Sequence, residues 1–520
     1  MIDHWWVTRP KRRLNSIPET LATFAGISLD QEWHGQRDVH LSLEEALEEA
    51  GIKRIGERRD HGGGGARTYY AWLLSLGLIF TQESTGQIKL TLAGEAILAG
   101  DSPVRILTNQ ILKYQFPSAF SIRRGVAVSP RFRIRPFRFL LKLLSDQSIG
   151  FLTEEEIANV VIVEAIDETD ACYSMVKNKI LQYRESSNFI LSLDFADVLS
   201  QRVASPKTDL PYNKLRDTAN TFVNWIEYTQ LALRSDEDRA LRIIPEKRNS
   251  VRKILSTDPP FIDRPEQQEY FQRKFGVDPN HQKDTRNLSN SGTITPQMIM
   301  SQQIKHAFIS EALITPVIRI TSDLVDKIAD QTGLLPKYVE ESLLDLYPHG
   351  AIGAFMSGYF EMAFRGRDEA VDFEKATVEL FQRVFGFTAE HIGPKGLTPD
   401  VLIISDSDGY CAILDNKAYG CYTITNDHRN RMIHNYINGL HRYYRDHQPL
   451  AFFSYIAGGF GKNIDSQIKS IADETSINGS AISVSNMIRI IENQQTSNLS
   501  HQKIRDIFSI NRQVLLSDIE

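Results

Sequence analysis

The sequence predicts a multidomain protein that combines α+β and α/β modules. Its 520 residues exceed the usual size of one domain, and a hydrophobic content of 42% is enough for several cores. In the first half of the chain, helical spacings of apolar residues precede short alternating segments, which predicts helices with small β-hairpins. In the second half, two apolar runs flank a turn, which predicts a β-hairpin in a C-terminal domain.

Charge and cysteine content indicate a cytoplasmic protein. The net charge of −6 gives no general attraction to nucleic acid, so any contact with DNA must come from local basic segments. The three cysteines, Cys172, Cys411 and Cys421, have neither metal-ligand spacing nor a paired framework, which fits a reducing compartment. We find no signal peptide and no apolar run long enough to span a bilayer, so we expect no membrane partner.

The N-terminus opens with an aromatic and basic segment. Trp5 and Trp6 precede a cluster of four cations, namely Arg9, Lys11, Arg12 and Arg13. Such a segment can lie along a phosphate backbone, with an arginine free to reach a base edge. It can equally be a solvated arm that the tryptophans anchor to the first domain, and the two interpretations are compatible.

A helical and alternating pattern follows this segment. Helical apolar spacing from Arg67 ends at Gly77, and an alternating strand and a second helix occupy residues 88–98. A run of four glycines, residues 62–65, lies before the first helix and can let a backbone approach DNA closely, although a flexible connection explains it as well. The arginines that flank this loop, and that we expect to contact DNA, are Arg58, Arg59 and Arg67.

Residues 102–145 contain no acidic side chain and form the most basic stretch of the chain. The arginines at positions 131, 133 and 135 alternate, so in an extended segment they share one face. A strip of this kind suits contact with phosphates, and the lack of compensating acids favours DNA over a merely solvated face. The arginines expected to contact DNA here are Arg123, Arg124, Arg131, Arg133 and Arg135.

A second module repeats this order of elements. Helical patterns at residues 137–144 and 154–163 precede a long helical stretch at 214–231 and a strand at 241–245. Both units resemble a winged helix, whose recognition helix sits in the major groove while the wing touches the backbone, although winged helices also bind proteins. Together with residues 113–118, the region resembles the recognition half of the AlwI family of type IIS endonucleases and their strand-nicking relatives.

Two aspartates and a lysine frame the predicted C-terminal hairpin. Asp400 enters the first apolar run, and Asp415 and Lys417 leave the second. An antiparallel hairpin brings its open ends together, so the carboxylates can meet, with Asp415 and Lys417 on one face and Asn416 on the other. Carboxylate oxygens suit Mg²⁺, which activates water, and a lysine can orient the nucleophile or neutralise a phosphate. The pattern indicates phosphodiester hydrolysis with Asp400 and Asp415 as metal ligands; a solvated strand end is the simpler alternative.

The segments around the hairpin extend this pattern. Residues 373–393 before it, and residues 451–462 and 479–485 after it, resemble in order the helix, glycine loop and later strands of FokI-like PD-(D/E)xK cleavage domains. The resemblance implies a central mixed β-sheet flanked by helices, and catalytic roles for Asp400, Asp415 and Lys417. It also implies an acidic residue on the preceding helix, for which Glu374 matches and Glu379 is the alternative. The helix near residues 428–441 occupies the position where FokI-like domains dimerise, but the charged pair expected there is not evident.

The resemblances divide the chain into four expected parts. Asp258-Pro-Pro and a polar stretch at residues 282–295 are typical of a linker. We expect an N-terminal DNA-recognition domain with a winged helix, a second winged-helix-like module, a linker with connecting helices, and a PD-(D/E)xK endonuclease domain, at residues 1–145, 146–256, 257–335 and 336–520 respectively.

The two resemblances together imply a type IIS restriction endonuclease, which binds a short double-stranded DNA site and cuts at a fixed distance outside it. One chain carries one catalytic hairpin, so a double-strand break implies a transient homodimer through the nuclease domain or a partner nuclease subunit. A site-specific nicking endonuclease, or the large subunit of a heterodimeric one, is the alternative. A catalytically inactive winged-helix DNA-binding regulator is a third interpretation.

Overall fold

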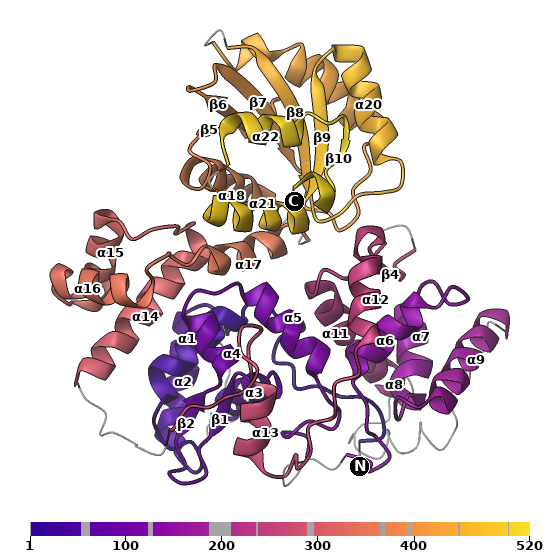
Figure 1. Cartoon of the computed structure of the whole chain (residues 1–520), viewed down its shortest axis with the longest axis vertical. Coiled ribbons are helices and arrows are strands. Elements are labelled where there is room, and N and C mark those ends of the chain that lie inside the picture. Colours follow the sequence, from indigo (N-terminus) through magenta and orange to yellow (C-terminus); the bar gives the residue numbers. More distant parts are fainter. Residues whose placement is uncertain are drawn as a thin grey trace. The chain divides into compact units, whose positions relative to one another are not determined.

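The chain folds into two compact units in this computed structural model (Figure 1). One unit comprises Met1–Ile309 with Gln331–Leu334, and the other comprises Ser310–Asp330 with Leu335–Glu520. The structure describes residues 2–53, 63–122, 128–186, 210–235, 238–288, 296–364, 366, 370–393, 397–445, 448–497 and 499–519. No helix within these ranges is long and apolar enough to cross a membrane.

The first unit begins with helices and a small antiparallel hairpin. Its elements in order are α1 (Ile17–Ser28), α2 (Arg37–Glu49), α3 (Gly64–Ser75), β1 (Ile79–Thr81), β2 (Ile88–Leu90), α4 (Leu92–Leu98) and α5 (Pro103–Lys113). Gly77 ends the α3 segment with φ +69°, and a Cβ there would also lie 2.5 Å from the Phe275 ring. The predicted helix, strand and helix are therefore confirmed.

The rest of this unit is mainly helical and contains a second hairpin, β3–β4. Its elements are α6 (Pro136–Ser145), α7 (Glu154–Glu156), the π-helical η1 (Ile157–Val161), α8 (Ile162–Glu164), α9 (Asp170–Ser186), α11 (Leu210–Tyr228), β3 (Ala232–Arg234), β4 (Leu241–Ile243), the 3₁₀ turn η2 (Pro245–Lys247), α12 (Arg248–Ser256) and α13 (Gln268–Phe275). Aromatic rings form its core: Trp225 stacks on Phe137 with ring centroids 5.9 Å apart. Trp5 is fully buried and donates from Nε1 to the Ala165 carbonyl at 2.7 Å, so the N-terminal segment is anchored.

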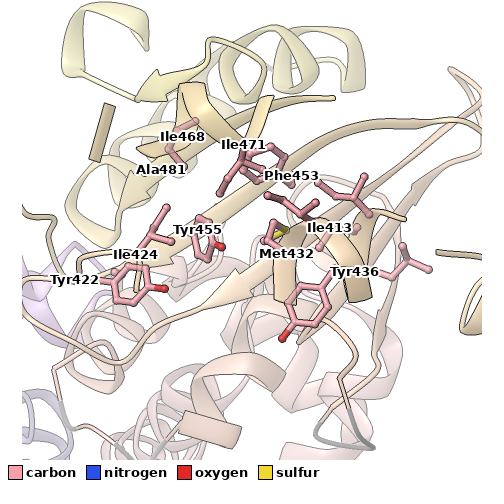
Figure 2. Packing of buried hydrophobic residues seen from close by; sticks show 14 of the residues in the cluster. Ile413, Tyr422, Ile424, Met432, Tyr436, Phe453, Tyr455, Ile468, Ile471 and Ala481 are labelled. Atoms are coloured by element: carbon pink, nitrogen blue, oxygen red, sulfur yellow. The ribbon is translucent and has the colours of Figure 1, made fainter. Parts of the chain in front are cut away.

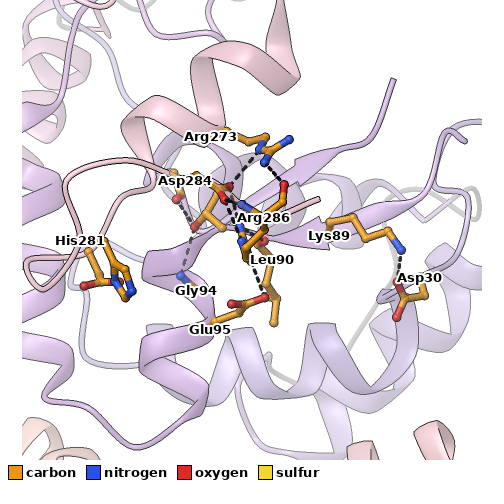
Figure 3. Close-up of polar contacts among 12 residues, drawn as sticks. Asp30, Lys89, Leu90, Gly94, Glu95, Arg273, His281, Asp284 and Arg286 are labelled. Atoms are coloured by element: carbon orange, nitrogen blue, oxygen red, sulfur yellow. Dashed lines mark hydrogen bonds and ion pairs between the residues drawn. The ribbon is translucent and has the colours of Figure 1, made fainter. Parts of the chain in front are cut away.

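The predicted linker is partly packed rather than free. Asp284 accepts from Arg273 at 3.0 Å and from Arg286 at 2.8 Å, and Arg286 also pairs with Glu95 on α4 and donates to the Leu90 carbonyl (Figure 3). Residues 284–288, which the sequence analysis placed in a linker, are thereby packed within the first unit. Residues 289–295 lie outside the described part of the chain.

A six-stranded mixed sheet forms the centre of the second unit, as predicted. The strands run β10-β9-β8-β7-β6-β5, antiparallel from β5 to β7 and parallel from β7 to β10. They are β5 (Thr388–His391), β6 (Val401–Ser405), β7 (Tyr410–Asn416), β8 (Leu450–Ala457), β9 (Asn478–Ser483) and β10 (Arg512–Gln513). Every residue of β6 and β7 is buried, as expected for strands covered on both faces.

The helices and helical turns of this unit precede, separate and follow the strands along the chain. They are α14 (Pro296–Ile314), whose C-terminal end belongs to this unit, α15 (Ser322–Thr332), α16 (Pro336–Leu346), α17 (Ile352–Met362), α18 (Ala370–Arg383), α19 (Asn426–Asn430), the π-helical η4 (Arg431–Ile437), the 3₁₀ turn η5 (Leu440–Arg442), α20 (Ile464–Thr475), α21 (Val484–Ser497), α22 (His501–Phe508) and the 3₁₀ turn η6 (Leu516–Asp518). Helix α18 packs against β5, β6 and β7.

A continuous apolar core joins the sheet to η4 and α20. Ile413 on β7 and Phe453 on β8 lie near Met432 from η4 and Ile468 and Ile471 from α20 (Figure 2). Burying side chains of this size stabilises the fold by roughly 1.5–3 kcal/mol each. This packing fixes the end of β7, where the predicted site lies.

Candidate active site

The hairpin brings the predicted acidic residues together. Strand β6 pairs with β7 so that Val401 faces Leu414 and Ser405 faces Tyr410. The turn between them closes through a bond from Gly409 N to the Ser405 carbonyl at 2.9 Å, and Gly409 has φ +66°. Asp400, just before β6, therefore lies beside the end of β7, as the sequence predicts.

Asp400, Asp415 and Lys417 form a compact polar centre. The backbone N–H of Asn416 donates to Asp400 Oδ2 at 2.7 Å. Lys417 Nζ lies 2.7 Å from Asp415 Oδ2 and 3.8 Å from Asp400 Oδ2. The Asn416 side chain points to the opposite face and donates to Thr377 Oγ1 at 2.6 Å on α18. The predicted alternation of these residues is confirmed.

Burial and neighbouring charges shift the ionisation of the groups in this centre. The side chains of Asp400, Asp415 and Lys417 are 17%, 3% and 14% exposed. Burial, and next the repulsion of Asp415, raise the pKa of Asp400 well above its usual value. Burial alone would lower the pKa of Lys417, but the attraction of Asp415 and Asp400 outweighs it and raises the pKa. Asp415 Oδ1 is buried and has no hydrogen-bond partner among the described residues.

Glu374 is the acidic residue of α18 that faces this centre. It is buried, it contributes to the raised pKa of Asp400, and its Oε2 lies 2.7 Å from His391 Nε2 on β5. Glu379, the alternative, pairs with Arg383 at the exposed side of the helix. The structure thus favours Glu374. His391 was not predicted as a site residue, although its position at the end of β5, opposite Val401, follows from the pairing of β5 with β6.

Three tyrosines that the sequence analysis did not identify line the same centre. Tyr455 is the pairing partner of Asp415 on β8, and Tyr422 and Tyr436 lie close enough to Asp415 that its charge contributes to their raised pKa values after burial. Backbone bonds hold the segment after Lys417 in place, including Tyr422 N to the Gly459 carbonyl at 2.8 Å. The closely spaced aromatic residues after Lys417 are the only sequence signal for this environment.

Within the described ranges, no three or more His, Cys, Asp or Glu side chains are grouped so that they could hold a metal ion.

The helix predicted near residues 428–441 is observed as α19, η4 and η5. On it, Arg429 pairs with Glu474 of α20, and Arg431 pairs with Asp427 at 2.7 Å.

The expected arginine strip is only partly open. Arg131 and Arg133 are exposed, but Arg135 is buried at 4% exposure and pairs with Glu168 and Asp258. The expectation that all three share one open face therefore fails at Arg135, because Glu168 and Asp258 bind its guanidinium. Arg131 pairs with Asp3 at 2.7 Å.

The other predicted DNA contacts divide into three groups. Arg12 pairs with Asp217 of α11 at 2.8 Å, and Arg9 donates to Thr218 at 3.2 Å, so the N-terminal segment follows α11. Lys11 and Arg13 are partly exposed, and Arg67 is exposed on α3. The remaining predicted residues lie outside the described part of the chain: Arg58, Arg59, Arg123 and Arg124.

Family comparisons identify the class of protein. Residues 335–515 match the model of the FokI cleavage domain, and residues 74–342 match the model of the AlwI restriction endonuclease family. These matches define a type II site-specific deoxyribonuclease. The second match covers more than half of the chain, so the chain belongs to the AlwI restriction endonuclease family. It is a type IIS restriction endonuclease that binds DNA, and both sequence resemblances are confirmed.

Similar solved structures are distant in sequence. Restriction endonuclease FokI is 14% identical with a TM-score of 0.29, over 99% of this chain and 100% of that one. FokI bound to DNA is 15% identical with a TM-score of 0.28, over 95% and 89%. The BpuJ1 endonuclease binding domain, in complex with pyrene- and phenanthrene-modified DNA, is 16% identical with a TM-score of 0.36, over 53% and 95%. No curated protein matches the chain.

Proposed function

We propose that the second unit is a PD-(D/E)xK nuclease domain whose catalytic residues are Asp400, Asp415, Lys417 and Glu374. The observation that carries this proposal is the position of Lys417, whose ammonium lies within 3.8 Å of both aspartates at the end of the hairpin. A surface charge run would leave these groups solvated, whereas here they are largely buried. Their mutual placement supports a reaction centre rather than a solvated strand end.

We propose Mg²⁺ as the cofactor, with Asp400 and Asp415 as its protein ligands. The residues fit a hard divalent cation, because Asp415 Oδ1 is buried and finds no partner among the residues that the structure describes. Asp400 is also subject to like-charge repulsion, which a cation would relieve. When bound, such an ion would activate a water molecule and stabilise charge on the phosphate oxygens.

The protein groups have distinct roles in this proposal. The Asn416 N–H fixes Asp400, and Asp415 holds the Lys417 ammonium in its charged form. Lys417 then orients the attacking water or neutralises the scissile phosphate. His391 holds Glu374 beside the aspartates through the 2.7 Å contact. The buried tyrosines around Asp415 limit access of bulk water on that side.

We further propose that the first unit reads a short double-stranded site. The order α1, α2, α3, β1, β2 supports a winged helix within residues 1–145, and α11 followed by β3 and β4 supports a second such module within 146–256. In this scheme residues 257–335 connect the reader to the nuclease domain at 336–520, and cleavage falls at a fixed distance outside the site. The protein acts in the cytoplasm within a restriction-modification system.

A single centre normally cuts one strand. We therefore propose that double-strand cleavage requires a transient homodimer through the nuclease domain or a partner nuclease subunit. The second candidate function is site-specific nicking, alone or as the large subunit of a heterodimer. The single catalytic hairpin of the described chain, β6–β7, favours it. An inactive DNA-binding regulator is disfavoured by the intact arrangement of Asp400, Asp415 and Lys417.

Digestion of supercoiled and linear plasmid with Mg²⁺, for wild type beside Asp415→Ala, tests the proposal. The proposal is supported if only the wild type produces discrete DNA ends and these ends lie at a constant offset from a shared short sequence. Open circles without linear product would favour nicking. Equal cleavage by the Asp415→Ala protein would reject the assigned centre.

A further inference from the structure

Helix α12 has an outer face that carries only cations and small polar groups. Val251 is its one fully buried side chain. At about 100° per residue, the outward positions fall within an arc of about 140°. They are Arg248, Asn249, Arg252, Lys253 and Ser256, and all five are exposed. The helix contains no acidic residue.

The three cations of this face are not neutralised by any carboxylate in the described part of the chain. Among the residues that the structure describes, no carboxylate forms an ion pair with Arg248, Arg252 or Lys253, and Arg252 donates only to Asn249 at 3.3 Å. Four cations on the neighbouring elements behave differently, because each pairs with a carboxylate: Arg135, Lys142, Arg234 and Arg242. Like charges one turn apart repel each other and do not stabilise the fold. The face is therefore suited to an anion from outside the chain.

The helix is held firmly at both ends. Before it, Ile244 N donates to the Leu231 carbonyl at 3.0 Å, and η2 leads directly into α12. After it, Arg138 of α6 donates to the Thr257 carbonyl, and Arg135 binds Asp258 at 2.8 Å. Two arginines of the basic stretch thus fix α12 instead of presenting their own charges. A rigid element loses little conformational entropy when it binds.

We infer that the outer face of α12 binds the sugar-phosphate backbone of double-stranded DNA. The inference rests on the proposed role of the first unit in DNA recognition and assigns a surface to it. B-DNA carries one negative charge per about 1.7 Å of axis, so three unpaired cations, an amide and a hydroxyl match its backbone. Contacts of this kind hold a protein on the duplex without reading its sequence. They differ from the base contacts that define the recognised site.

The test is the salt dependence of DNA binding, measured by fluorescence anisotropy without Mg²⁺ on a cognate and an unrelated duplex. The variant is R248Q/R252Q/K253Q. The control R242Q/R383Q/R489Q removes the same charge from cations that are paired within the chain. Each lost phosphate contact reduces the magnitude of the slope of log K against log salt by about 0.9. The slope of the triple variant should therefore be smaller in magnitude by about 2.7, whereas the slope of the control should change little. Binding should weaken by a similar factor on both duplexes.

The outcomes separate this inference from the proposed function. If the variant keeps the wild-type slope and affinity while wild type binds and cleaves, the inference is wrong and the proposed function stands. If wild type binds neither duplex, both are wrong. If the triple variant loses affinity for the cognate duplex alone, the inference about α12 is also wrong, because that result indicates base reading. Should the triple variant fail to fold, each single variant must lower the slope by about 0.9, and R252K must restore it.

Discussion

His391 Nε2 lies 2.7 Å from Glu374 Oε2, and this contact joins β5 to α18 beside the two aspartates. Groups that orient a metal-site carboxylate typically contribute about 10–100-fold to activity or metal affinity. We expect Glu374→Gln and His391→Leu to lower cleavage by about that factor and to raise the Mg²⁺ concentration needed for half-maximal rate. Plasmid cleavage across an Mg²⁺ titration measures both effects. Glu379→Gln is the matched control on the same helix, and an equal defect in it would contradict the assignment.

The raised pKa of Asp400 predicts an unusual pH profile. Burial and the repulsion of Asp415 favour its protonated form, and only the carboxylate form can bind a cation. As the pH falls, cleavage should therefore be lost at a pH above the ordinary value of about 3.9 for aspartate. Because Mg²⁺ competes with the proton, more Mg²⁺ should move this loss to lower pH. An acid limb that does not respond to Mg²⁺ would speak against Asp400 as a ligand.

Removing the charge of Asp400 should stabilise the metal-free protein. A carboxyl whose pKa is raised in the folded state is less favourable as an anion there than in the unfolded chain, so it destabilises the fold at neutral pH. Asp400→Asn keeps an acceptor for Asn416 N–H. We expect a higher melting temperature for this domain, by about 2–4 °C for each 1 kcal/mol, with cleavage abolished. Calorimetry in EDTA measures the shift, and a lower melting temperature would refute the repulsion.

We expect Arg135 to stabilise the folded first unit rather than to contact DNA. Its guanidinium is buried and bound by Glu168 and Asp258. Glu168 is largely buried, so leaving it unsatisfied costs about 1–3 kcal/mol, and Arg135→Met should lower the free energy of unfolding by that amount. Asp258 is exposed, so water can replace its bond to Arg135. Arg133→Gln, at an exposed neighbour, should change it by less than about 0.5 kcal/mol. Urea denaturation compares the two variants, and equal stabilities would show that the ion pairs at Arg135 contribute nothing.

Asp284 should make the first unit sensitive to acid. Burial alone would raise its pKa, but bonds from Arg286 and Arg273 outweigh this and lower the pKa well below the usual range. The stabilisation is fully present above the unfolded value of about 3.9 and is lost as the pH falls through the folded pKa. Asp284→Asn should lower the melting temperature at neutral pH and lessen the difference between neutral and acidic pH. An unchanged melting temperature would mean that the network in Figure 3 does not stabilise residues 284–288.

The sequence alone determined the local elements and the core of the site. Apolar periodicity placed α3, α11 and the β6–β7 hairpin, because helix and strand spacings are properties of short segments. The same local rule joined Asp400 to Asp415 and set Asn416 on the opposite face, since a hairpin has its own register. The motifs were also sufficient for the two family resemblances.

Only the tertiary structure decided which charged groups are available. Whether Glu374 or Glu379 faces the aspartates depends on how α18 packs against the sheet, and His391 reaches Glu374 only because β5 pairs with β6. Arg135 is bound by Glu168 and Asp258, 33 and 123 positions away, whereas the cations of α12 have no carboxylate partner among the described residues. Charge is visible in a sequence, but its neutralisation depends on contacts between distant segments. For that reason the basic stretch at residues 102–145 predicted an open strip, and the fold instead used Arg135 and Arg138 to hold a different basic helix.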